Sequence, residues 1–177
     1  MSTSDARYDP TTLFLHWATA VLVGVTWISG QTIDWFPKGP VKIDARSAHF
    51  TLGILIAAIT GYRIYWRSLK GKHFDADAGL SALLAKVVKL GLYVLILMTV
   101  ALGLYNLFLR GDVIFNLFAA PKIGTLTVQA RHAVVDEVTG IHVLCANLIL
   151  GLAGLHACAA LFHRYILKDR VFQRMWP

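Results

Sequence analysis

The segment from Gly140 to His163 (GIHVLCANLILGLAGLHACAALFH) constrains the fold of this chain more than any other part. It is almost entirely apolar, contains no acidic residue and, as one helix, is long enough to span a bilayer. Its residues His142 and His156 are 14 positions apart, so both imidazoles leave the same helix face, about 21 Å apart along the axis. Since a histidine inside a membrane is costly, this pattern indicates two cofactor sites stacked across a membrane.

The composition also favours a membrane protein. Of the 177 residues, 56% are hydrophobic and 15% are charged, and the apolar residues form long runs. The basic residues behind the net charge of +7 lie at span ends and in loops, so the charge reflects membrane topology rather than nucleic-acid binding. The polar start and the lack of a small-residue cleavage site argue against a cleavable signal peptide. Cys145 and Cys158 lie about 19 Å apart in one span, which excludes a disulfide between them.

Four apolar runs predict an all-α integral membrane bundle of four helices, formed by a single domain over residues 1–177. We expect spans at about residues 12–30, 46–66, 83–109 and 136–165. The sequence Asp9-Pro10-Thr11-Thr12 predicts a helix start in which a threonine hydroxyl caps the first turn. Trp17 is a candidate anchor at the membrane interface.

Four spans place both termini on one side, and the basic residues indicate which side. Ten lie near the termini or between spans two and three: Arg7, Arg67, Lys70, Lys72, Lys86, Lys89, Arg164, Lys168, Arg170 and Arg174. Six lie in the other two connections: Lys38, Lys42, Arg46, Arg110, Lys122 and Arg131. Because short loops rich in Lys and Arg stay in the cytoplasm, we expect both termini there.

The direction of each span sorts four histidines into two levels. His16 and His156 share the cytoplasmic level, whereas His49 and His142 share the outer level. Haem iron takes axial ligands on both faces of the ring, and neutral imidazoles from facing helices can supply them. We therefore expect two haems, one for each pair. Small residues would let a flat macrocycle approach the backbone at Gly53, Gly151 and Gly154.

Other roles for the histidines stay open. An intramembrane histidine can simply form a hydrogen bond between helices. Zinc is another candidate metal, although neither pair has the third and fourth ligands of a closed site. His163 is the main rival ligand because it lies on nearly the same face as His156, and it is also a candidate neighbour of a quinone or a haem propionate. His73 and His132 fall in predicted loops, where we expect them to be solvated.

Two arginines are candidates for binding haem propionates. Arg63 lies 14 residues after His49, on the same face but near the cytoplasmic level, where it could pair with a propionate of the inner haem. The alternative is an arginine whose side chain extends to the cytoplasmic interface. Arg46, one turn before His49, could serve the outer haem, with Arg131 and Lys122 as further candidates.

These residues resemble the bacterial cytochrome b561 family, whose members are four-helix, di-haem membrane proteins. The resemblance covers nearly the whole chain and rests on these pieces: Leu15-His16-Trp17, His49 with Gly53 and Arg63, Gly140-Ile141-His142, Gly154-Leu155-His156, and Ala160-Leu161-Phe162-His163 with Lys168-Asp169. It implies two b haems with bis-histidine ligation, in the inner membrane of a bacterium. Family members often carry a histidine and a proline in span three, where this chain has Lys89 and Val100. Those departures affect cofactor contacts and helix shape, not the expected iron ligands.

The resemblance also implies a function. Two stacked haems carry electrons across a bilayer, and in the family a quinone is one partner and superoxide, in some members, the donor. We expect a superoxide:ubiquinone oxidoreductase, in which superoxide is oxidised at the outer haem and ubiquinone is reduced within the membrane. Basic residues could steer the anion, or merely balance propionates and lipid charge: Lys38, Lys42, Arg46, Lys122 and Arg131.

Two other functions remain in view. One is an electron-transfer subunit between quinone and a protein such as a dehydrogenase or hydrogenase, as in wider relatives of the family. The other is a non-redox metal carrier whose histidines bind no haem. The quinone site is not defined by the sequence, and Arg63, His163 and Lys89 are candidates for it by position.

Overall fold

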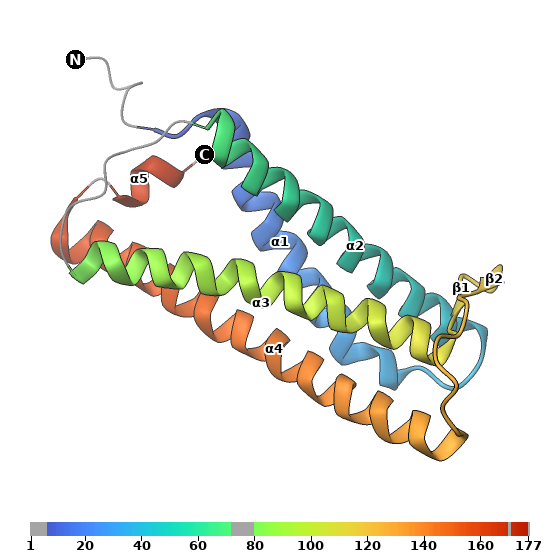
Figure 1. The fold of residues 1–177 in the computed structure, drawn as a ribbon. Coiled ribbons are helices and arrows are strands. Elements are labelled where there is room, and N and C mark those ends of the chain that lie inside the picture. The colour runs from blue at the N-terminus through green and yellow to red at the C-terminus, as the bar shows by residue number, and fades with distance from the viewer. Residues whose placement is uncertain (1–6, 72–79, 170, 177) are drawn as a thin grey trace.

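The computed structural model describes residues 7–71, 80–169 and 171–176, and it is an all-α bundle (Figure 1). Its four long helices are α1 (Pro10–Thr32), α2 (Pro40–Leu69), α3 (Leu80–Arg110) and α4 (Val128–Phe162). All four are long and apolar enough to cross a membrane. A 3₁₀ turn (Ile33–Trp35) follows α1, and a π-helical turn (His163–Leu167) and the short α5 (Val171–Met175) follow α4. The predicted solvated His73, and Lys72 and Arg170 of the charge pattern, lie outside the described residues.

All four helices begin earlier than predicted; α1, α2 and α3 contain their predicted spans, whereas the fourth predicted span, 136–165, runs past the end of α4 into the π-helical turn. At α1 the cap is the Asp9 carboxylate, which accepts hydrogen bonds from the Thr12 backbone N–H (2.9 Å) and hydroxyl (2.7 Å). The predicted threonine cap is therefore wrong, because the carboxylate satisfies the free N–H and leaves Pro10 at the first helical position. The helix α2 begins at Pro40, so Lys42 belongs to a helix and not to a loop.

The last connection is shorter than predicted. Thr127 caps α4, and its side chain accepts a hydrogen bond from the Ala130 N–H, so Arg131 and His132 lie in the first turns of a helix rather than in a loop. The remaining connection contains a two-stranded antiparallel hairpin, β1 (Val113–Ile114) and β2 (Phe118–Ala119). Residues Phe115 and Asn116 make its turn with positive φ values of 47° and 57°.

The bundle is built from two helix pairs, α1 against α2 and α3 against α4 (Figure 1). Ile56, Ile96 and Ile149 form the buried centre. Most other large apolar side chains on the helices are exposed, as expected for faces that contact lipid. The start of α1 and the short α5 lie at one end of the bundle, which we call the termini end, and β1 and β2 lie at the other, the hairpin end (Figure 1).

At the termini end, the tail returns to the bundle. The Tyr8 N–H donates to the Arg174 carbonyl (3.1 Å), and the Trp17 indole N–H donates to the Met175 carbonyl (2.9 Å). Trp17 also packs edge-on against Trp176, with ring centres 6.2 Å apart. Trp17 therefore ties α5 to α1, a role in addition to its predicted position near an interface.

Candidate functional site

Four histidines meet in two pairs inside the bundle. His16 of α1 and His156 of α4 form the termini-end pair, with ring centres 6.3 Å apart. His49 of α2 and His142 of α4 form the hairpin-end pair, with ring centres 6.1 Å apart. The structure thus brings together the same two pairs of histidines that span direction had matched by level.

Both separations fit an iron ion between two imidazoles. With metal–nitrogen bonds of about 2 Å on each side, the two ring centres lie roughly 6 Å apart. The described residues contain no group of three or more His, Cys, Asp or Glu side chains placed to hold a metal ion by themselves. A planar macrocycle that supplies the other four ligands suits such two-histidine sites better than tetrahedral zinc does.

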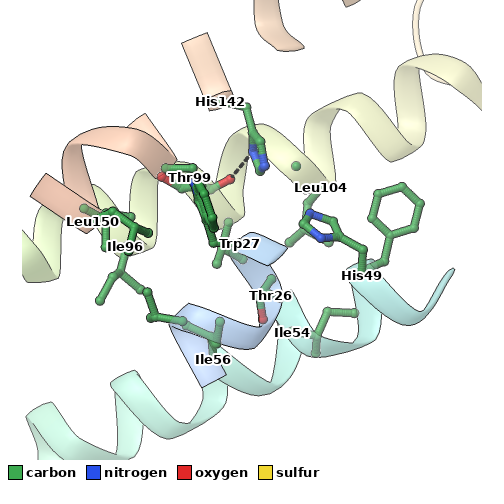
Figure 2. A pocket seen from close by; sticks show the side chains of 17 residues that line it. Thr26, Trp27, His49, Ile54, Ile56, Ile96, Thr99, Leu104, His142 and Leu150 are labelled. Atoms are coloured by element: carbon green, nitrogen blue, oxygen red, sulfur yellow. Dashed lines mark hydrogen bonds between the residues drawn. The ribbon is translucent and has the colours of Figure 1, made fainter. Parts of the chain in front are cut away.

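The hairpin-end pair lines an apolar cavity (Figure 2). The space within it, including its open part, is about 660 Å³. Figure 2 shows His49 and His142 approaching the same space from opposite helices, with Trp27 and Ile96 further along it. Gly53 also lines the cavity, and a Cβ there would meet no atom within 4 Å, so this glycine leaves the open space that a flat ring needs.

Hydrogen bonds define which nitrogen of each hairpin-end histidine carries hydrogen. His142 Nδ1 lies 2.9 Å from the Thr99 carbonyl oxygen, which can only accept, so Nδ1–H is the donor (Figure 2). His49 Nδ1 lies 2.9 Å from the Ser29 hydroxyl oxygen, and that hydroxyl already donates to the Thr26 carbonyl at 2.7 Å. The hydroxyl oxygen therefore accepts from His49 Nδ1–H. In both neutral rings the Nε2 lone pair remains available for a metal.

Two glycines make room for these rings. A Cβ on Gly30 would lie 3.0 Å from His49 Cε1, and a Cβ on Gly103 would lie 3.3 Å from His142 Cε1. Both contacts are tighter than ordinary van der Waals packing, so each imidazole occupies the space that its neighbouring glycine leaves.

The termini-end pair has a different environment. The Arg63 guanidinium is 3.0 Å from His16 Nδ1 and lies over the Tyr93 ring, 5.6 Å from its centre. Arg63 Nε is buried and has no hydrogen-bond partner in the part of the chain that the structure describes. Arg63 thus points into the bundle toward His16, rather than extending freely to the interface, while one of its donors remains available.

Several predicted basic residues are already bonded at the hairpin end. Lys42 pairs with Asp34 (2.8 Å), and Arg46 pairs with Asp112 (3.0 Å). Arg131 donates to three carbonyls, of Leu109, Ile123 and Gly124, and so fastens the last connection to the end of α3. Among the described residues, no acidic side chain pairs with Lys38 or Lys122.

The remaining candidates lie apart from the two pairs. His163 begins the π-helical turn after α4, and its Nδ1 contacts the Asp169 carboxylate. Among the described residues it meets no second imidazole. Lys89 is exposed on α3, whereas Val100 lines the hairpin-end cavity, and His132 is exposed at the start of α4.

The Asp169 contact makes the tail sensitive to acid. Its hydrogen bond with His163 lowers the pKa of the Asp169 carboxyl, which also accepts from the Val171 N–H at the start of α5. A carboxyl whose pKa is lower in the folded than in the unfolded protein stabilises the fold at pH values above its unfolded pKa of about 3.9. This contribution is lost as the pH falls through the lower folded pKa. We expect hydrogen exchange in residues 171–176, corrected for intrinsic rates, to rise a few-fold below about pH 4. Asp169→Asn should raise it already at pH 7; unchanged exchange would contradict this role.

Sequence reasoning missed four positions around the hairpin-end pair: Ser29, Gly30, Thr99 and Gly103. Ser29 and Gly30 close the first apolar run, and a hydroxyl beside a glycine there was the available signal. The Thr99 contact involves its backbone carbonyl, which any residue has, so the sequence holds no signal for it.

Comparison of the sequence with known proteins identifies the family of this chain. The sequence model of a family described as prokaryotic cytochrome b561 matches residues 7–177. The chain belongs to the prokaryotic cytochrome b561 family. The predicted resemblance is thereby confirmed, and membership identifies the protein as a multi-pass bacterial membrane cytochrome with b-type haem.

Three curated relatives cover nearly the whole chain. The cytochrome b561 homolog 1 of Escherichia coli (strain K12) is 27% identical, over 97% of each chain. The probable superoxide oxidase CybB of Yersinia pestis is 29% identical, over 97% of this chain and 96% of the relative. The cytochrome b562 of Cereibacter sphaeroides is 30% identical, over 98% of this chain and 97% of the relative.

Proposed function

We propose that this cytochrome is a superoxide:ubiquinone oxidoreductase with two b haems. The observation that carries the proposal is the pair of two-histidine sites at opposite ends of a bundle of membrane-spanning length. Such a protein is suited to transferring electrons across a bilayer. The relative named as a probable superoxide oxidase, aligned over 97% of this chain, supports superoxide as the donor.

The residues have distinct roles in this proposal. His16 and His156 ligate one iron, and His49 and His142 ligate the other. When bound, the haems supply sites that accept and release single electrons. Two superoxide ions give two electrons and two dioxygen molecules, and one ubiquinone takes up two electrons and two protons to form ubiquinol. Arg63, whose Nε has no partner among the described residues, is the candidate for a haem propionate at the termini end.

The charge pattern supports an orientation. Ten basic residues lie near the termini and the α2–α3 connection, against six in the other connections, which favours termini in the cytoplasm and a hairpin end at the periplasmic side of the inner membrane. Superoxide would then react at the hairpin-end pair, and ubiquinone at the termini end, where Arg63, His163 and Lys89 are candidates to contact it.

Fewer basic residues remain candidates for steering superoxide than the sequence predicted. Lys42, Arg46 and Arg131 are bonded to carboxylates or carbonyls, so their charges are partly balanced or already used. Lys38 and Lys122 are exposed, and among the described residues no acidic side chain pairs with either, so these two are the candidates that remain for anion steering.

The double variant Lys38→Gln/Lys122→Gln should lower the rate of reaction with superoxide several-fold at low salt. The effect should shrink as ionic strength rises, because exposed charges are screened beyond about 10 Å at 0.1 M salt. The matched control is Lys86→Gln/Lys168→Gln, which removes two exposed charges at the other end. Equal rates and equal salt dependence in both variants would contradict steering by Lys38 and Lys122.

The test of the function is stopped-flow absorption of the purified oxidised protein. We expect added superoxide to reduce the b-type absorption, and ubiquinone added next to reoxidise it. Haems that do not react with superoxide, together with a co-purifying redox protein, would favour the electron-transfer subunit instead. Absence of haem after expression with ample haem supply would favour a metal carrier.

A further inference from the structure

The two histidine pairs differ in how their rings are held. We propose that the hairpin-end pair is pre-organised to take up haem and the termini-end pair is not, so that the hairpin-end site binds haem more tightly and fills first. The inference rests on the proposed ligation by the four histidines, but not on superoxide as the substrate.

The hairpin-end rings already have the tautomer that iron requires. A neutral imidazole that binds a metal through Nε2 must carry its hydrogen on Nδ1. The Thr99 carbonyl holds that hydrogen on His142, and the Ser29 hydroxyl holds it on His49. Gly30 and Gly103 leave space for both rings, so ligand orientation costs little when haem enters.

At the termini end, His16 is held in the opposite tautomer. A guanidinium only donates, so His16 Nδ1 accepts from Arg63, and the hydrogen of the neutral ring must be on Nε2. The Nε2 lone pair is then not available. Ligation of iron by His16 Nε2 requires Arg63 to leave Nδ1 and the ring hydrogen to move to it.

His156 differs from the other three histidines. Among the described residues, no hydrogen bond orients its ring, and it is more exposed than the other three histidines. The termini-end site must therefore break one contact and order a second ring before it can hold iron. The loss of a single partner that orients a metal-bound histidine typically weakens metal binding about 10–100-fold, which sets the difference expected between the sites.

The experiment is haem competition at equilibrium with increasing apomyoglobin. In the wild type, we expect haem to be withdrawn in two steps separated by at least about ten-fold in apomyoglobin concentration. The His156→Ala variant, which keeps the hairpin-end site, should retain the tighter step, and His142→Ala, which keeps the termini-end site, should retain the weaker one. A single step for both haems, or the tighter step in His142→Ala, would overturn the proposal.

Ser29 provides a test that leaves all four histidines in place. Ser29→Ala should weaken the tighter step about 10–100-fold and leave the weaker step unchanged, whereas Ser29→Thr keeps the hydroxyl and should restore it. The control is Thr51→Ala, because among the described residues the Thr51 hydroxyl bonds only to the Ser47 carbonyl of its own helix. An unchanged tighter step in Ser29→Ala would overturn the proposal even if the histidine variants failed to fold. Absence of both steps, with no haem in the wild type, would instead refute ligation itself.

Discussion

His142→Ala is expected to reduce the haem content from two to one per chain and to abolish one of the two low-spin b-haem signals. His142 is one of two imidazoles whose ring centres lie 6.1 Å apart, and alanine offers no nitrogen to the iron. His156→Ala should remove the other haem by the same reasoning. The measurement is a haem-to-protein ratio with an electron paramagnetic resonance spectrum of the oxidised protein.

The control for these variants is His132→Ala. His132 lies on the same helix as His142 but is exposed and belongs to neither pair. The His132→Ala variant should therefore retain both haems. Two unaltered haem signals in His142→Ala, or the loss of one in His132→Ala, would show that the paired histidines are not the ligands.

Gly30→Leu is expected to empty the hairpin-end site without changing any iron ligand. The first side-chain carbon alone would lie 3.0 Å from His49 Cε1, and the rest of a leucine would push the ring away from the Ser29 hydroxyl. Such overpacking costs about 1–3 kcal/mol, and movement of the His49 ring away from its position relieves it. The expected spectrum keeps one of the two b-haem signals, the one that His142→Ala also keeps.

The matched control is Gly24→Leu on the same helix. A Cβ at Gly24 meets no atom within 4 Å, so the substitution has space at its first carbon and changes the same residue type. Both haems should remain. Retention of two haems in Gly30→Leu as well would mean that the space beside His49 is not needed for ligation.

Much of this architecture could be predicted because membranes impose simple rules. Backbone polar groups must be satisfied inside lipid, so each long apolar run had to be a helix, and helix direction then matched His16 with His156 and His49 with His142. Helix ends were less predictable. Asp9 rather than a threonine caps α1, and Thr127 starts α4 before Arg131, because local caps compete within a few residues.

Beyond the signal at Ser29 and Gly30, the contacts around the rings could not be predicted. The bonds from His49 to Ser29 and from His142 to the Thr99 carbonyl join different helices, so they depend on helix rotation and depth to within an ångström or so. The same holds for Arg63, whose spacing from His49 indicated its face but not its contact with His16. Pattern defines the face of a helix, whereas packing defines the partner atom.

The ligation of two haems by four histidines is tested most directly by a reduced-minus-oxidised absorption spectrum of the purified wild-type protein, with haem and protein quantified on the same sample. We expect two low-spin b haems per chain. After expression with ample haem, a ratio of one would contradict ligation at one of the two pairs, and a ratio of zero would contradict it at both.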